Sequence, residues 1–273
     1  MSPEDLDQVD LIVSTIQDPA DILIREALTK GIAHIGITKL ADKLTPTLFA
    51  IQKHPPTAPI IPLGHSQAGI LTWVAHKEAQ SFRSIHSIHL AGLYDERDPM
   101  GPMTLEDTEG FINRALLRED GKWKWAWAPE HPRSIRLQDG AFVEGHPISL
   151  LDVPSLAAAT DARNIRFDFA VGDSIGTRAG GKASQDLYIE LEGVLHDGRF
   201  MKRRITITDP EGQAHFTALG VLLSVERILG LDGLPPAPGG FYLPETLVLA
   251  DSVMARLEQF RIQIIVEESE GDS

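Results

Sequence analysis

The chain has 273 residues, of which 42% are hydrophobic and 23% are charged, and its formal net charge is −14. This composition is typical of a globular protein with one large or two modest domains. The acidic balance argues against nucleic acid as a partner, because phosphate binding needs a basic surface. The sequence has no cysteine, which excludes disulfides, thiolate metal sites and cysteine nucleophiles.

No run of about 18 apolar residues is present, which argues against a transmembrane helix. The first ten residues, MSPEDLDQVD, are acidic and polar, which argues against a secretory signal. From these two features we predict a cytoplasmic protein with no membrane partner.

The first part of the chain alternates strands with helices. The β-branched run 9–16 predicts a buried strand, residues 20–31 have helical spacing, and 32–38 predicts a second strand. A strand–helix–strand unit of this kind implies parallel strands. The pattern continues with a helix over 44–53, a strand over 59–63, a helix over 66–80 and a strand over 84–94. These residues predict a parallel α/β sheet.

After residue 95 the pattern changes. Two β-rich runs, 186–195 and 200–208, flank the Asp197-Gly198 turn and predict an antiparallel hairpin. Shorter strand-like segments cover 122–129, 141–151 and 165–173. A buried helix is expected over 209–231, followed by a connector at 234–240, a helix over 245–260 and a strand over 262–266. This region therefore predicts an α+β arrangement.

The turn Gly64-His65-Ser66-Gln67-Ala68 allows two interpretations. It follows a strand and precedes a helix, as the nucleophile elbow G-x-S-x-G does, but Ala68 replaces the final glycine. A hydrolase of that type also needs an acid and a histidine on later loops. Asp95 is placed for the acid, whereas His131 and His146 fall in the antiparallel region and His215 falls inside a helix. The alternative is a structural turn in which Ser66 caps the helix.

The segment GTRAGGK at 176–182 matches the phosphate-loop pattern G-x-x-x-x-G-K. Ala183 replaces the Ser or Thr that holds magnesium, and the next residues predict a strand in place of the required helix. We therefore expect a mobile glycine-rich loop, with Arg178 and Lys182 offering positive charge near a substrate cleft.

Other motifs are weak. His86 and His89 are three apart in a strand and should point to opposite faces, so no metal site is predicted. Trp123, Trp125 and Trp127 alternate on one face, which favours a packed sheet face or a dimer surface. The segment DPEG at 209–212 with His215 is expected to cap a helix.

Taken together, three segments resemble the saccharopine dehydrogenase-like NAD(P)-dependent oxidoreductases. VDLIVSTIQDPADILIREALTKGIAHIGIT resembles the later half of that family's dinucleotide-binding domain, and PIIPLGHSQAGIL resembles the next strand and its glycine turn. DPEGQAHFTALGVLLSVERILG followed by PGGFYLPE resembles the C-terminal helix and closing segment. The resemblance implies hydride transfer between NAD or NADP and an amino-acid-derived or related small metabolite.

The sequence departs from the family at its beginning. The family starts with a strand carrying G-x-G-x-x-G, which places the pyrophosphate on a helix N-terminus, and no such segment precedes Val9. Three explanations stay open: a truncated chain, a relative that has lost dinucleotide binding, or completion of the sheet by another chain. An apolar sheet edge at 9–16 would favour self-association, so we predict a homodimer.

The predicted fold is α/β, a partial Rossmann-like parallel sheet followed by an α+β domain with an antiparallel sheet. We place the dinucleotide-binding domain at 1–95, the substrate or dimerisation domain at 96–240, a helix and strand that the resemblance returns to the first domain at 241–266, and an acidic disordered tail at 267–273.

Ligands of such sheets bind at the carboxyl ends of the strands. The cofactor-binding residues predicted there are Thr15, Ile16, Gln17, Thr38, Lys39, Gly64, His65 and Ser66. His65 and Tyr94 are the candidates for an acid or base, because both lie near strand ends. Two alternatives remain: a non-catalytic or truncated family member that binds a metabolite or dimerises, and an α/β-type serine hydrolase that uses Ser66.

Overall fold

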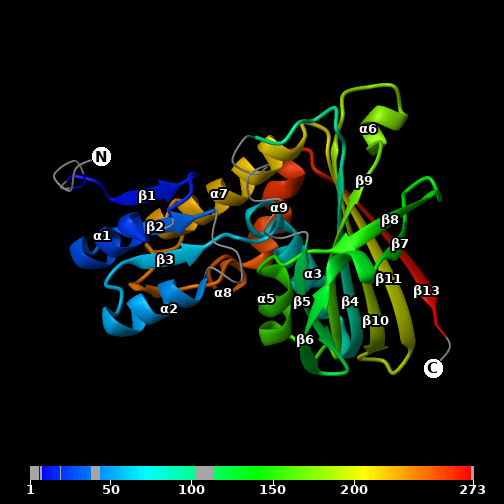
Figure 1. The fold of residues 1–273 in the computed structure, drawn as a ribbon, viewed down its shortest axis with the longest axis horizontal. Helices are drawn as coiled ribbons and strands as arrows, with labels where there is room; N and C mark the ends of the chain where they lie inside the picture. Colours follow the sequence, from blue (N-terminus) through cyan, green and yellow to red (C-terminus); the bar gives the residue numbers. More distant parts are fainter. Residues whose placement is uncertain (1–5, 7, 19, 38–43, 102–112, 272–273) are drawn as a thin grey trace.

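The computed structural model describes residues 6, 8–18, 20–37, 44–101 and 113–271. Two sheets lie side by side, one of four strands and one of nine, with helices packed around and between them (Figure 1). The predicted α/β fold class, with a parallel sheet and a second sheet that contains antiparallel pairs, is confirmed.

The four-stranded sheet has the order β1-β2-β3-β12, and its neighbouring strands are parallel. The strands are β1 (Leu11–Ser14), β2 (Ala33–Gly36), β3 (Pro59–Pro62) and β12 (Gly240–Phe241). Helices α1 (Ile22–Lys30) and α2 (Leu44–Lys53) lie on one face, and α7 (Gln213–Leu229) lies on the other. Because side chains alternate along β3, Ile60 packs among the apolar side chains of α1 and Ile61 among those of α7. The sheet is therefore covered on both faces.

The nine-stranded sheet is built around β4 (Phe82–Tyr94), which pairs antiparallel with β10 and parallel with β9. Its main path has the order β13-β11-β10-β4-β9-β5-β6, and β8 also pairs with β9 and with β7. The other strands are β5 (Arg114–Glu119), β6 (Lys122–Trp127), β7 (Arg133–Arg136), β8 (Phe142–Pro147), β9 (Asn164–Val171), β10 (Gln185–Leu195), β11 (Phe200–Asp209) and β13 (Gln263–Glu270). The predicted hairpin is the β10–β11 pair.

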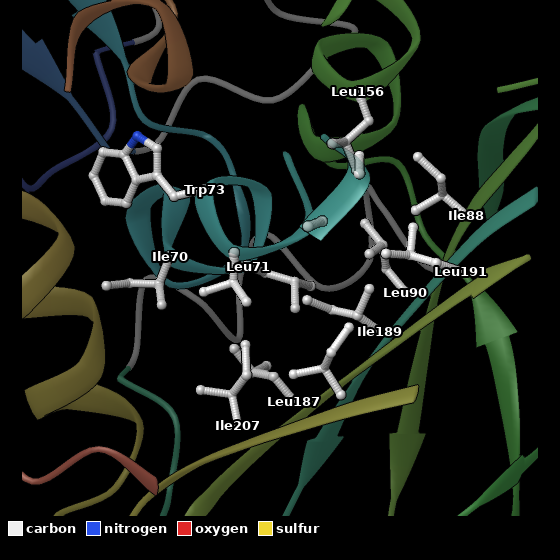
Figure 2. Packing of buried hydrophobic residues seen from close by; sticks show 14 of the residues in the cluster. Ile70, Leu71, Trp73, Ile88, Leu90, Leu156, Leu187, Ile189, Leu191 and Ile207 are labelled. Atoms are coloured by element: carbon white, nitrogen blue, oxygen red, sulfur yellow. The ribbon is translucent and has the colours of Figure 1, made fainter. Parts of the chain in front are cut away.

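One face of this second sheet carries the main hydrophobic core. Helices α3 (Ile70–Ala79), α5 (Asp152–Ala159) and α9 (Ala250–Gln259) contribute to it. Figure 2 shows Leu71 of α3 on the side of the helix that faces Leu187 and Ile189 of β10. Each fully buried aliphatic side chain of this kind contributes about 1.5–3 kcal/mol to folding.

The opposite face of the second sheet carries buried charge. The Asp168 carboxylate is inaccessible to solvent and lies 2.7 Å from Arg133 Nε, and it also accepts from Arg166. Arg133 in turn donates to Glu190 at 2.6 Å. Both charges of each pair are hydrogen-bonded, which offsets the cost of removing them from water.

The three tryptophans of β6 lie on one exposed face of the edge hairpin, as alternation predicts. Trp123, Trp125 and Trp127 are each about half exposed, at 49%, 45% and 50%. The Arg114 guanidinium lies 4.1 Å from the ring centre of Trp125, close enough for a cation–π contact.

Several element boundaries differ from the prediction. The helix expected over 66–80 starts as α3 at Ile70, because Gln67 and Ala68 have left-handed backbone angles. The helix expected over 209–231 starts at Gln213, after Gly212 with φ 94°. The helix expected over 245–260 consists of α8 (Pro244–Leu247) and α9, separated by extended residues.

The assignment of segments to the two sheets also differs. Strand β4 lies in the second sheet, although the 1–95 domain boundary placed it with the parallel sheet. The C-terminal strand does not return to the first domain: β13 pairs with β11, and it extends into the segment expected to be a disordered tail. Glu267 and Glu268 lie opposite Arg204 and Arg203 of β11, and this charge match explains the ordered pairing. From the segment placed at 241–266, Phe241 of β12 pairs with β3, and Leu247 of α8 packs into the core of the first sheet.

Of the helices that the structure describes, none has the length and apolarity to cross a membrane.

Candidate active site

A cavity of about 230 Å³ lies between the two sheets, at the carboxyl ends of β2 and β3. This edge of a parallel sheet is where open α/β folds bind their ligands. The residues after β2 and β3 form one wall, and the ends of β4, β9, β10 and α7 form the other. The described lining consists of Ile37, Leu63, Gly64, His65, Ser66, Gln67, Ala68, Gly92, Leu93, Tyr94, Met100, Ile148, Leu150, Phe167, Phe169, Gln185, Leu187, Gln213 and Thr217.

The turn after β3 is held in an unusual backbone conformation. Gln67 and Ala68 have φ values of 47° and 52°, and Gly69 follows with φ 102°. Consecutive non-glycine residues in this region carry backbone strain, and such residues gather at functional sites. The turn thereby brings Ser66, Gln67 and Ala68 into the cavity wall.

Helix packing clamps this turn from both sides. A side-chain carbon added at Gly220 of α7 would lie 2.6 Å from the Gln67 carbonyl oxygen and 2.8 Å from that of Ala68. A carbon added at Gly69 would lie 3.1 Å from Pro244 of α8. Only a glycine at position 220 lets α7 approach the turn this closely.

A buried carboxylate fixes the start of the turn. Asp152 of α5 accepts a hydrogen bond from the Ser66 backbone N–H at 2.8 Å and another from the Thr72 hydroxyl at 2.8 Å. Burial raises the pKa of Asp152 to about 6, although the bonds from Ser66 and Thr72 oppose this rise. The Asp152 carboxylate therefore occupies the position at the N-terminal end of this turn that an external anion would otherwise take.

His65 lies at the junction of the cavity and a buried polar cluster. Its Nε2 is 2.7 Å from the Ser155 hydroxyl, and its buried Nδ1 has no hydrogen-bond partner among the described residues. Burial lowers the pKa of His65 to about 3, so the imidazole is neutral at physiological pH. Ser155 also contacts Glu245, whose pKa is raised by burial.

The remaining polar groups of the wall are amides and hydroxyls anchored by the protein. Gln185 Nε2 donates to the Leu93 carbonyl at 3.1 Å, and Gln213 Nε2 donates to the Asp98 carbonyl at 2.7 Å. The Thr217 hydroxyl donates to Gln67 Oε1 at 2.5 Å. Anchoring of this kind fixes the orientation of each amide before a ligand arrives.

An aromatic pair forms part of the apolar wall. The rings of Tyr94 and Phe169 are stacked, with centres 5.9 Å apart and planes inclined by 24°. Tyr94 ends β4 and Phe169 lies in the adjacent strand β9. Both residues line the cavity, so the stacked pair forms an aromatic part of its wall.

The structure brings together only part of the predicted site. Gly64, His65, Ser66 and Tyr94 all line the cavity. Thr15, Ile16 and Gln17 follow β1, the outer strand of the parallel sheet, and they are not among the described lining residues. Thr38 and Lys39 lie outside the described residues.

Sequence reasoning missed most of the second wall. Phe167, Phe169 and Leu187 lie on strands of the second sheet, and Gln213 and Thr217 lie on the first turns of α7. The rule that locates ligands at the ends of parallel strands gives no information on these positions. The segment DPEGQAHFT was a usable signal, because its glycine predicts the helix start that faces the cavity.

The geometry gives Ser66 no base. In the described part of the chain, His65 contacts Ser155, and His215 lies 2.7 Å from Asp209, so neither bonds to the Ser66 hydroxyl. The strained positions of the turn are Gln67 and Ala68, one residue later than an elbow requires.

Asp95, the acid that such a hydrolase would use, accepts hydrogen bonds from Ser174 and Thr177 instead. Burial alone would raise the pKa of Asp95, but these bonds lower it to about 2.

The glycine-rich segment 176–182 also differs from the prediction. It begins in a short helix, α6 (Ile175–Arg178), which is capped by Ser174, and strand β10 follows it. Arg178 pairs with Asp139, Lys182 pairs with Glu211, and neither is among the described residues of the cavity wall. Both cations are already neutralised by carboxylates of the chain.

His86 and His89 contribute to a second cavity of about 410 Å³ on the charged face of the second sheet. The register between β4 and β10 shifts next to His86, which interrupts the alternation assumed for these two residues. No group of three or more potential metal ligands gathers in the described ranges.

No protein-family model matches the sequence, and no curated protein matches it. Solved structures, in contrast, match the chain. The structure of saccharopine dehydrogenase (L-Glu forming) from Saccharomyces cerevisiae, in its apo form, matches with a TM-score of 0.66 at 12% identity, over 98% of this chain and 86% of that one. The chain has the fold of saccharopine dehydrogenase.

A second solved structure agrees. Homospermidine synthase from Legionella pneumophila, in complex with NAD, matches with a TM-score of 0.63 at 12% identity, over 99% of this chain and 78% of that one. The resemblance to the saccharopine dehydrogenase-like oxidoreductases is thereby confirmed at the level of the fold.

The described residues of the cavity wall and of α1 differ in what they offer a dinucleotide. The described wall contains no Asp, Glu, Lys or Arg. The N-terminus of α1 is already occupied: the Asp18 carboxylate accepts from the N–H groups of Ile22 and Leu23 at 2.8 and 2.9 Å. A pyrophosphate would compete there with a fixed negative charge.

Proposed function

We propose that this chain is an oxidoreductase that holds the nicotinamide end of NAD(P) in the cavity between its sheets and acts on a small molecule bound beside it. One observation supports this most: the cavity lies at the carboxyl ends of β2 and β3 and is bounded on its other side by the second sheet, in a fold shared with saccharopine dehydrogenase. Gly64 and Ser66 would hold the nicotinamide-ribose side, as the sequence resemblance implies.

The chemistry that NAD(P) supplies is hydride transfer to or from a carbon atom of the substrate. The chain must then supply or remove a proton at the substrate oxygen. We assign this proton to the hydroxyl of Tyr94, a residue of the aromatic part of the cavity wall. Neutral His65 acts as a hydrogen-bonding and positioning residue, because its pKa of about 3 leaves no ring proton to donate as imidazolium.

Titration with reduced nicotinamide ligands tests the proposal. We expect NADH or NADPH to raise the melting temperature, since a ligand at a hundredfold excess over its Kd adds about 2.7 kcal/mol of stability. Reduced nicotinamide mononucleotide should bind nearly as tightly as the dinucleotide, because the described residues offer no free helix N-terminus at α1 for the pyrophosphate. No response to any of the three ligands would refute cofactor binding.

A matched pair of variants on α7 localises the binding. Thr217 lines the cavity, whereas its neighbour Ala218 is exposed. Thr217→Trp should fill the cavity and abolish the response, and Ala218→Trp should leave it unchanged. If both variants respond like the wild type, the nicotinamide does not bind in this cavity.

A second candidate function is a non-catalytic protein of the same fold that binds a metabolite in the cavity. The Asp18 carboxylate at the N-terminus of α1 favours it, since that end of the helix is then closed to phosphate. This candidate predicts ligand binding with no turnover in the presence of NADH or NADPH.

The homodimer and the cytoplasmic location also remain proposals. The homodimer is supported by β1, the outer strand of the parallel sheet: Val13 in this strand is 37% exposed, and Ile16, two residues after its end, is 62% exposed. Light scattering should give twice the monomer mass for the wild type and a lower mass for Val13→Lys. A wild-type monomer would contradict the homodimer.

A further inference from the structure

The second cavity, of about 410 Å³, lies on the charged face of the nine-stranded sheet, opposite the main hydrophobic core. We propose that it binds a small zwitterion in which an ammonium and a carboxylate group are separated by several bonds. This inference goes beyond the proposed function and does not depend on it. It rests on the charged side chains that line the cavity and on their positions along three neighbouring strands.

The floor of the cavity is formed by β9, β4 and β10, and its rim includes the tip of the β5–β6 hairpin. Strand β4 has a β-bulge at this point: Ser87 pairs with Glu192 and Ile85 pairs with Gly193, so His86 has no partner on β10. His86 and Ser87 both line the cavity, although consecutive residues of a regular strand point to opposite faces. Bulges of this kind redirect side chains beside active sites.

One end of the cavity is positively charged. The guanidinium groups of Arg133, Arg166 and Arg204 share the two carboxylates of Asp168 and Glu190, so this group carries one positive charge in excess. Arg133 and Arg166 line the cavity. Bonds to these carboxylates and to a backbone carbonyl engage two N–H groups of Arg133 and three of Arg166. Each guanidinium has five such donors, so both retain donors for a ligand carboxylate.

His89 lies beside this group of arginines and adds no charge to it. Burial lowers the pKa of His89 to about 4, and among the neighbouring charges the Arg133 guanidinium lowers the pKa more than the Glu190 carboxylate raises it. The imidazole is therefore neutral at physiological pH. The positive charge at this end of the cavity comes from the arginines alone.

The acidic residues lie further along the same strands. His89 is opposite both Arg166 of β9 and Glu190 of β10, whereas Ser87 is opposite Glu192. Glu192, which lines the cavity, is thus two residues beyond the row that contains the arginine, a distance of about 7 Å along the sheet. The two kinds of charge are separated along the strand direction.

The hairpin tip completes the acidic end. The Asp120 backbone N–H donates to the side-chain oxygen of Asn164 at 2.9 Å, which fixes the tip against β9. Glu119 and Glu192 each pair with a lysine outside the described wall, whereas no cation of the described residues pairs with the Asp120 carboxylate. Asp120 is therefore the acid that is available to a ligand ammonium group.

The third arginine of the wall, Arg118, is engaged at the hairpin. Its Nε donates to the Ala162 carbonyl at 3.1 Å, and its guanidinium lies 5.4 Å from the ring centre of Trp123. A ligand with a single charge would then satisfy one end of the cavity and be repelled by the other, whereas a zwitterion is attracted by both. The separation of about 7 Å calls for a chain of several bonds between the two ligand charges.

Four ligands that differ in charge or length test the inference: 5-aminopentanoate, pentanoate, pentylamine and glycine. We would measure their affinities for the nucleotide-free full chain by titration calorimetry. We expect 5-aminopentanoate to bind at least about fivefold more tightly than each of the other three, which corresponds to about 1 kcal/mol. Equal or weaker binding of 5-aminopentanoate, or binding of none of the four, would overturn the inference.

A matched pair of variants locates the ammonium end. Asp120→Asn retains the fold, since asparagine tolerates the φ of 49° at this position. It should weaken 5-aminopentanoate by about threefold, as for an exposed ion pair, and should not weaken pentanoate. The control is Asp251→Asn on α9, a helix that packs on the opposite face of the sheet. An unchanged affinity in Asp120→Asn, or an equal loss in both variants, would contradict the inference.

Thr217→Trp separates this site from the cavity between the sheets. That substitution should fill the first cavity and leave the binding of 5-aminopentanoate unchanged, because the two cavities lie on opposite faces of the nine-stranded sheet. Loss of binding in a folded Thr217→Trp variant would place the zwitterion in the first cavity and overturn the inference. If this variant does not fold, the Asp120 and Asp251 variants still decide. Failure of NADH and NADPH to bind would refute the proposed function and leave this inference intact.

Discussion

Asp152 should make the stability of the fold depend on pH in a direction opposite to that of most carboxylates. It is fully buried, and its pKa is raised from 3.8 to about 6 by burial. One pKa unit corresponds to about 1.36 kcal/mol, so the ionised carboxylate costs the folded state about 3 kcal/mol relative to the protonated form. The contribution of Asp152 to the free energy of unfolding is therefore fully present below 3.8, its pKa in the unfolded chain. This contribution is lost as pH rises through about 6.

His65 makes the stability of the fold depend on pH in the opposite direction. Its pKa is lowered from 6.5 to about 3, so its stabilisation is present above 6.5 and is lost as pH falls toward 3. Between about pH 7 and pH 5 the chain gains about 1 kcal/mol from Asp152 and loses about 2 kcal/mol from His65. The two effects partly cancel in the wild type, so single variants are needed to separate them.

Urea unfolding of the wild type, Asp152→Asn and His65→Gln at several pH values measures both contributions. The stability of the wild type relative to Asp152→Asn should rise by about 1 kcal/mol as pH falls from about 7 to 5. Relative to His65→Gln it should fall by about 2 kcal/mol over the same interval. Differences that stay constant with pH would refute the assignment of buried, shifted pKa values to these two residues.

Three further predictions concern packing and charge. Gly220→Ala should destabilise the protein by about 1–2 kcal/mol in urea unfolding and should weaken ligand binding. Alanine is the better helix former, but its added carbon meets two backbone oxygens closer than 3.0 Å. A more stable variant would contradict the close packing of α7 against the turn. Asp168→Ala should cost about 3–5 kcal/mol, since it leaves Arg133 and Arg166 without their shared carboxylate; a loss under about 1 kcal/mol would show that the arginines find other partners. Trp73→Ala should cost about 3–5 kcal/mol because the side chain is 1% exposed, whereas Trp125→Ala on the exposed stripe should cost about 1 kcal/mol or less; similar melting temperatures for the two variants would contradict this contrast.

The sequence was most informative where periodicity is set locally. The helix over 44–53 and the hairpin around Asp197-Gly198 were predicted closely, because helical spacing and turn chemistry act within a few residues. The left-handed turn at Gln67 was not predictable in this way. Its conformation depends on α7 and α8 packing against it from distant parts of the chain.

Sheet membership was the main failure. Strand β4 has the same apolar character as a parallel-sheet strand, yet it pairs with β10 and β9 of the second sheet. No local pattern in 84–94 distinguishes the two sheets. The same limitation explains the candidate site: Gly64, His65 and Ser66 follow from the end-of-strand rule, whereas Phe169 and Gln185 come from strands whose partners were unknown.

The late position of β12 in the sequence constrains the order in which this chain can fold. Strands β1, β2 and β3 are complete by residue 62. The second neighbour of β3 is β12 (Gly240–Phe241), and the helix that covers one face of the sheet is α7, so both come late in the chain. During synthesis the first sheet therefore emerges with an open edge and a bare apolar face, and it stays so until nearly the whole second sheet has been made. We expect ribosome-bound intermediates ending before residue 213 to be sensitive to proteolysis and to need a chaperone, and protection of the first three strands to arise only in a late, cooperative step.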